Sequence, residues 1–190
     1  MENTKEFRNL LDLLGSINKE NIVLGLQVAQ NYKQEFLAYF GCEVREMADL
    51  VDILTENNGW NIAMPLLEIS HLNCDNRNLH EFPRAICALK EIKYLNLENN
   101  QLQNIPKEIE NLTKLSDLDL TYNQLESIPK EILKLTNLNY LYLGNNQIQS
   151  IPKEICKLIN LKSINISNNK IPANEIENLR KMFPNCEIIA

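Results

Sequence analysis

Residues 89–111 read LKEIKYLNLENNQLQNIPKEIEN, and the same pattern returns in residues 112–134 and 135–157, with a period of 23 residues. A partial copy follows from Leu158, and a degenerate copy begins at Leu66. Self-similarity at a fixed period of this size is typical of repeat architectures, in which each repeat is one supersecondary unit. The sequence therefore predicts a stack of short repeats over most of its length.

A central L-x-L in each copy predicts a short strand. Its alternate apolar side chains point into the stack, and the residues between them point outward. One unit cannot bury its own apolar face, so neighbouring units are expected to form a parallel sheet over a continuous core. The inward columns are Leu95, Leu118, Leu141 and Ile164, with Leu97, Leu120, Leu143 and Ile166.

An asparagine follows each predicted strand. The chain must turn sharply there, which leaves backbone groups inside the stack, and an amide side chain can both donate to and accept from them. We therefore expect a structural asparagine ladder, with Arg77 as the exception in an atypical first repeat. The ladder consists of Asn100, Asn123, Asn146 and Asn169.

An Ile-Pro pair closes each motif, at Ile105, Ile128 and Ile151. Proline denies helix to the residue before it, so this side should be extended or tightly turned until the Lys-Glu-Ile that follows.

These columns and the I-P-K-E-I endings resemble the intracellular, Ras-group type of leucine-rich repeat, over Leu66 to Ala190. The resemblance implies an α/β solenoid, a right-handed superhelix with a concave parallel β-sheet used for protein recognition. It also implies partners of the kind that this type often engages, such as small GTPases or signalling scaffolds. Related bacterial proteins carry similar arrays.

Residues 1–61 lack the repeat. Phe7, Leu10, Leu11 and Leu14 follow helical spacing, and similar stripes recur up to Asn57. We expect a small all-α N-terminal cap, followed by a repeat domain over residues 62–190 with repeats starting near 66, 89, 112, 135 and 158. The cap should cover the first repeat, although its helices could instead form a second binding surface.

A C-terminal cap is expected at about residues 172–190. Apolar residues at helical spacing after Pro172 predict a closing helix; they are Ile176, Leu179, Met182 and Phe183. Ile188 lies 24 residues after Ile164, which predicts a last strand in register. On this reading the array is closed at both ends and the chain is complete.

Composition narrows the classes of function. With 44% hydrophobic and 23% charged residues, the chain can bury a core as a soluble protein. The net charge is −6, and the sequence contains no run of basic residues that would bind along a nucleic-acid backbone. No secretory signal is visible, and the apolar segment 22–29 is far shorter than the ~20 residues that span a bilayer. The five cysteines form no close pair, which favours the reducing cytoplasm. We expect a monomer without cofactor or metal.

The outward strand positions form three ladders across the repeats. The first is His71, Tyr94, Asp117, Tyr140 and Ser163; the second is Asn73, Asn96, Asp119, Tyr142 and Asn165; the third is Asp75, Glu98, Thr121, Gly144 and Ser167, with Tyr122 just beyond. Exposed tyrosines are common interface anchors, and acids beside them favour a partner carrying Lys or Arg.

The predicted protein-binding residues are therefore His71, Asp75, Tyr94, Asn96, Glu98, Asp117, Asp119, Tyr122, Tyr140, Tyr142 and Asn165. Taken singly, each of them is explained as well by keeping a sheet soluble and pairing across strands. Taken together, the tyrosines and acids favour binding.

Catalytic interpretations are weaker. His71 points outward and Cys74 inward by strand alternation, so they cannot easily share a ligand. Asp117 and Asp119 face the same way, but on an open sheet without a pocket to shift either pKa. Cys42 lies at a predicted helix boundary, where a thiol can be activated, yet a packing role is the better interpretation. We therefore expect that the protein is not an enzyme.

Two functions from different classes remain open. The first is a cytoplasmic protein-binding module, a signalling scaffold or regulator, that uses the concave sheet. The second is an effector or structural unit that associates through its helical cap, with the repeats as a spacer.

Overall fold

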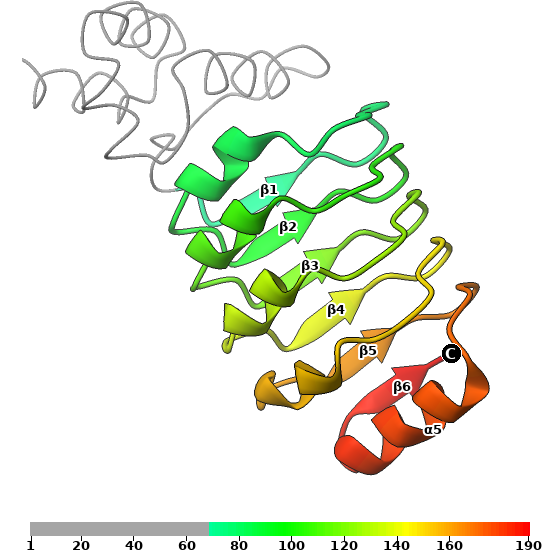
Figure 1. Cartoon of the computed structure of the whole chain (residues 1–190). Helices are drawn as coiled ribbons and strands as arrows, with labels where there is room; N and C mark the ends of the chain where they lie inside the picture. Colours follow the sequence, from blue (N-terminus) through cyan, green and yellow to red (C-terminus); the bar gives the residue numbers. More distant parts are fainter. Residues whose placement is uncertain (1–68) are drawn as a thin grey trace, which may run out of the picture. The chain divides into compact units, whose positions relative to one another are not determined.

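The computed structural model describes residues 69–190, in which six short strands form one parallel sheet in sequence order, β1 to β6 (Figure 1). Their bounds are β1 His71–Asn73, β2 Tyr94–Asn96, β3 Asp117–Asp119, β4 Tyr140–Tyr142, β5 Ser163–Asn165 and β6 Glu187–Ile189. This arrangement confirms the predicted stack of repeats, since each repeat contributes one strand to the sheet.

The chain divides into two compact units. One comprises Met1–Ser70 with Pro83–Glu91, and the other comprises His71–Phe82 with Ile92–Ala190 and holds all six strands. The described part of the first unit contains one 3-10 helix, η3 (Arg84–Ala88). The predicted all-α cap at 1–61, its possible binding role and Cys42 lie outside the described residues.

Strand register follows the sequence period. Leu95 pairs with Leu118, Leu118 with Leu141 and Leu141 with Ile164, each 23 residues apart. All four side chains are fully buried, at 0% exposure, so the inward column forms a continuous core under the sheet. Ile164 pairs with Ile188 across the longer step of 24 residues, which confirms the predicted last strand.

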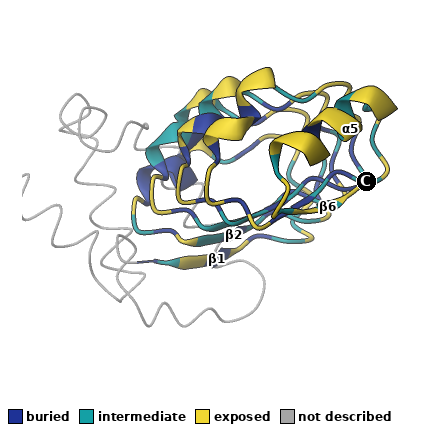
Figure 2. Cartoon of the chain, turned by 90° about the horizontal axis from the view of Figure 1, so that it is seen from below, coloured by how far each residue is buried: buried dark blue, intermediate teal, exposed yellow. Residues whose placement is uncertain are grey.

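The opposite side of the core carries single turns of 3-10 helix: η4 (Lys107–Asn111), η5 (Lys130–Lys134) and η6 (Lys153–Lys157). Each begins directly after the proline of its repeat. Proline has a fixed φ angle that suits a helix start, and it disfavours helical conformation at the residue before it. In η5 the Ile132 amide donates to the Pro129 carbonyl at 3.2 Å, and the Ile132 side chain is fully buried. This hydrogen bond confirms the predicted tight turn after the proline. Figure 2 shows that these helices also carry exposed residues.

The predicted closing helix is present as α5 (Ala173–Met182), which starts after Pro172. Of its expected apolar stripe, only Leu179 is buried, whereas Met182 is 46% exposed. The helix therefore attaches through a narrower contact than the sequence pattern predicts. Within residues 69–190, every helix is too short or too polar to cross a bilayer.

Candidate functional site

The outward side of the sheet is organised into ladders of side chains. Strand pairing aligns His71, Tyr94, Asp117, Tyr140 and Ser163 in one row and Asn73, Asn96, Asp119, Tyr142 and Asn165 in the next, and β6 adds Glu187 and Ile189. We call these two rows, together with Asp75, Glu98, Thr121, Gly144 and Ser167, the sheet face. Two members of the predicted ladders are covered: Ser163 is only 5% exposed, and Gly144 is buried.

Aromatic rings form two stacks on the sheet face. His71 stacks on Tyr94 with ring centroids 6.1 Å apart and planes 25° apart. Tyr140 stacks on Tyr142 at 6.4 Å and 18°. Tyr94 thus lies in a stack on β1–β2, and Tyr140 and Tyr142 form a stack on β4, whereas Tyr122 belongs to neither. The strand between β2 and β4 is β3, which carries Asp117 and Asp119.

Five carboxylates and no Lys or Arg lie in the three rows of the sheet face; the acids are Asp75, Glu98, Asp117, Asp119 and Glu187. This imbalance affects neighbouring titratable groups. Burial raises the pKa of Tyr94, and the carboxylates of Asp119 and Asp117 raise it further. Tyr142 has a raised pKa for the same two reasons.

Glu98 is subject to the same effect. Burial raises the pKa of its carboxyl, and the charges of Asp119 and Asp75 add to the shift. Like charges on neighbouring strands disfavour further negative charge, so a bound cation would be stabilised on this surface.

The middle row of the sheet face also has a structural task that the sequence analysis missed. Asn96 Oδ1 accepts a hydrogen bond from the Glu98 amide at 2.8 Å, and Asp119 Oδ1 accepts one from the Thr121 amide at 2.9 Å. Asn73 and Asn165 make the equivalent bonds at 3.1 and 3.0 Å. These side chains end the strands as Asx turns. The recurring Asn/Asp two residues before the turn was the signal that could have revealed this.

Tyr142 is the exception in that row, and Gly144 accompanies it. A Cβ added at Gly144 would lie 3.1 Å from Asn165 Oδ1 and 3.2 Å from Ser167 Oγ. The polar side chains of the next repeat therefore fill the space that a side chain at 144 would need. The Tyr142 side chain has no carbonyl oxygen that could form an Asx turn, and its ring stacks on Tyr140.

The asparagine ladder lies below the sheet face and joins the repeats. Asn123 Nδ2 donates to the Leu97 and Leu120 carbonyls at 2.9 and 3.1 Å, and Asn123 Oδ1 accepts from the Leu102 amide at 3.0 Å. Asn100 and Asn146 are buried in the same way, whereas Asn169 is half-buried. At the Arg77 exception, the Arg77 and Leu79 amides both donate to Asn100 Oδ1.

Among the described residues, no group of three or more His, Cys, Asp or Glu side chains could hold a metal ion. His71 is exposed and Cys74 is fully buried, on opposite sides of the sheet, as strand alternation predicts. Asp117 and Asp119 are half-buried on the open sheet face, and Asp117 accepts a hydrogen bond from Ser116 Oγ at 2.5 Å.

Cysteine reactivity is predicted to follow burial. Burial raises the pKa of Cys74 to about 12, whereas Cys156 is exposed on η6. Since only the thiolate attacks alkylating agents, iodoacetamide at about pH 8 should modify Cys156 about 100-fold faster than Cys74 or more. Peptide mass spectrometry gives the two rates. In concentrated urea the rates should converge, and equal rates in the native protein would contradict the buried position of Cys74.

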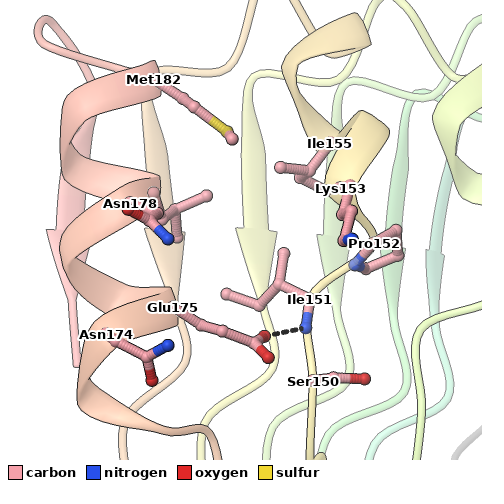
Figure 3. A pocket seen from close by; sticks show the side chains of 10 residues that line it. Ser150, Ile151, Pro152, Lys153, Ile155, Asn174, Glu175, Asn178 and Met182 are labelled. Atoms are coloured by element: carbon pink, nitrogen blue, oxygen red, sulfur yellow. Dashed lines mark hydrogen bonds between the residues drawn. The ribbon is translucent and has the colours of Figure 1, made fainter.

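A cleft of about 380 Å³ lies away from the sheet face, between α5 and the segment leading into η6 (Figure 3). Ile151, Ile155, Leu179 and Met182 line it. Its one carboxylate, Glu175, accepts a hydrogen bond from the Ile151 amide at 2.9 Å through Oε2. Lys153 is the other ionisable residue that lines the cleft, and Glu175 tethers α5 to the repeat of residues 135–157.

A parallel sheet built from 23-residue repeats and joined by buried asparagines defines a leucine-rich-repeat solenoid. The family model for the leucine-rich repeat region matches residues 63–183, and the chain belongs to this family. The Ras-group assignment within it stays a prediction.

Two solved bacterial structures are similar. A leucine-rich-repeat protein of Leptospira interrogans is 34% identical with a TM-score of 0.56, and the match covers 66% of this chain and 38% of that one. An internalin of Listeria monocytogenes is 24% identical with a TM-score of 0.50, covering 56% and 30%. The chain thus spans less than half of either neighbour. No curated protein matches.

Proposed function

We propose that this chain is a protein-binding module that recognises its partner with the sheet face. The observation that carries the proposal is the pair of aromatic stacks on either side of the β3 carboxylates, on a surface that has no Lys or Arg. Leucine-rich-repeat proteins generally mediate protein–protein interaction through the surface that their stacked strands create. Tyrosines in such a patch supply contact area and a polar tip.

The partner that fits this surface carries Lys or Arg. Complementary charge speeds association and selects against acidic partners. A small GTPase, which the Ras-group resemblance implies, would fit if it presented a basic patch, and the chain would then act as a cytoplasmic scaffold or regulator. Binding is the whole of the proposed activity, with no catalytic step.

The size of the face limits how it can bind. Six strands about 4.8 Å apart, and about 13 Å along each strand from the first row to the third, give a flat area on the order of 300 Å². A standard interface buries about 800 Å² on each partner. The partner is therefore a short segment, or it extends over the rim of the sheet.

A double variant tests the proposal. Tyr94→Ser with Tyr140→Ser removes one ring from each stack, whereas Lys107→Ser with Lys130→Ser changes exposed residues of η4 and η5 as a matched control. A partner captured by the wild type should stay with the control and bind the tyrosine variant at least about ten-fold more weakly. Circular dichroism should show all three proteins folded.

Raising the salt concentration should weaken capture by the wild type, because salt screens the attraction between the carboxylates of the sheet face and a basic partner. If the tyrosine variant and the control retain the partner equally well, the sheet face is not the binding site, and residues 1–61 become the segment to test.

A further inference from the structure

Five equivalent positions, one in each repeat, hold the backbone in the left-handed region. Four are asparagines, and their φ angles lie between 54° and 56°; they are Asn76, Asn99, Asn145 and Asn168. The fifth is Tyr122, with φ of 55°. Asparagine tolerates this conformation, whereas an aromatic residue is sterically disfavoured in it. The third repeat therefore uses a residue that its backbone does not favour.

The asparagines of this column also bond to one another. Asn168 Nδ2 donates to Asn145 Oδ1 at 3.0 Å, and Asn99 Nδ2 donates to Asn76 Oδ1. Tyr122 stands between Asn99 and Asn145 and interrupts the row. Among the described residues its side chain makes no hydrogen bond or ring contact, and the residue is 53% exposed. The tyrosine therefore adds no hydrogen bond to the row.

The position of Tyr122 on the rim suggests what the ring is for. It follows Thr121, which lies between Glu98 and Gly144 in the third row of the sheet face, and Asp119 caps the Thr121 amide. Residue 122 thus lies directly beyond the row that holds Glu98 and three residues after Asp119, and neighbouring strands are about 4.8 Å apart.

Positive charge lies on both rims. The residues just before β2 and β5 are Lys93 and Lys162, and both are exposed. On the rim that carries Tyr122, Arg77 and Lys170 lie in the outer repeats, so a basic partner is attracted to the middle of this rim, where Tyr122 follows the row that holds Glu98.

We propose that Tyr122, at the edge of the sheet face, is a specificity-determining residue, which stacks on the guanidinium group of an arginine in the partner while Glu98 or Asp119 pairs with it. The inference rests on the proposed function. Arginine fits better than lysine because its planar group can stack on a ring and offer several donors to a carboxylate at the same time. A lysine ammonium is a point charge that gains less from the ring.

Two synthetic probes test this assignment with the whole chain: a short fluorescent peptide of alternating glycine and arginine, and its glycine–lysine counterpart. The wild type should bind the arginine peptide more tightly than the lysine peptide in a fluorescence anisotropy titration. Tyr122→Asn should weaken arginine-peptide binding about five-fold or more. Tyr122→Phe, which keeps the ring in the same backbone conformation, should bind like the wild type.

Thermal unfolding supplies the second readout. Tyr122→Asn relieves the backbone and continues the asparagine row, so its Tm should rise by about 2–4 °C. A fall in Tm would mean that the ring supports the fold, and this would overturn the inference.

The remaining outcomes separate the two proposals. If Tyr94→Ser with Tyr140→Ser abolishes peptide binding and Tyr122→Asn leaves it unchanged, the role of Tyr122 is wrong and the sheet face stands. Equal affinity for the two peptides, or binding of neither, overturns the assignment of arginine, while the capture experiment still decides the proposed function independently.

Discussion

Replacing Asn123 by leucine should lower the free energy of unfolding by about 3 kcal/mol or more. The substitution removes a buried amide that serves the carbonyls of Leu97 and Leu120 and the amide of Leu102. Leucine has a similar size, so the loss arises from hydrogen bonds. The Leu102 amide is left inside the stack without a partner, at a cost of about 1–3 kcal/mol. The Leu97 and Leu120 carbonyls keep the amides of Asn100 and Asn146 as donors, so each loses one hydrogen bond of about 0.5–1.5 kcal/mol. Urea denaturation followed by circular dichroism measures the change.

Two comparisons make this prediction specific. Asn104→Leu changes an exposed asparagine and should stay within about 0.5 kcal/mol of the wild type. Asn169→Leu changes the last, half-buried member of the ladder and should have an intermediate effect, because water can replace part of what the side chain provides. A change below about 1 kcal/mol for Asn123→Leu would mean that the ladder does not join the repeats.

Leu141→Ala is the second large effect that we expect, a loss of about 2–5 kcal/mol in the free energy of unfolding. Leu141 is the central residue of β4, is fully buried, and pairs with Leu118 on one side and Ile164 on the other. Truncation leaves a cavity that neighbouring repeats can fill only by moving their own strands.

The matched control is Ile159→Ala. Ile159 is 77% exposed, so its truncation removes little buried area and should cost less than about 0.5 kcal/mol. The same denaturation measurement serves both variants, and similar losses at Leu141 and Ile159 would contradict a core that runs under the sheet. Since domains are stable by about 5–15 kcal/mol, the Leu141 variant should be visibly less stable at room temperature.

The fold could be predicted from the sequence because one repeat period determines the positions of its strands, turns and buried side chains. Once Leu95, Leu118 and Leu141 are aligned, strand order, register and the inward column follow, and the single step of 24 residues to Ile188 sets the last strand. The 3-10 helices follow from proline chemistry, which acts locally. None of these inferences required knowledge of how distant side chains pack.

The candidate site was less predictable, since outward positions carry no such constraint. Asn96, Asp119 and Asn165 appear in the sequence as surface polar residues, yet each bonds to the backbone two residues further along. The sequence alone does not show whether an outward-pointing asparagine caps a turn or contacts a partner. That distinction requires the geometry of the turn. The predicted binding roles of these three residues therefore remain proposals beside an observed structural role.

Two departures in burial lie at the C-terminal end of the array, in the repeats that start at residues 135 and 158. Ser163 is covered beside Glu187, whose carboxylate accepts its hydroxyl hydrogen bond at 3.2 Å, and Cys156 is exposed. The neighbour on this side is α5 rather than another repeat, and α5 buries only Leu179. The repeat pattern predicts a further repeat as the neighbour on this side. Because α5 and β6 take its place, Cys156 is exposed and Ser163 is covered.

The most direct test of the central claim is site-specific photo-crosslinking in living cells. A benzophenone amino acid replaces Tyr140 on the sheet face in one protein and Lys130 on η5 in another. Recognition by the sheet face predicts a covalent adduct with a second protein from position 140 and none from position 130. Adducts from position 130 alone, or equal adducts from both, would contradict it.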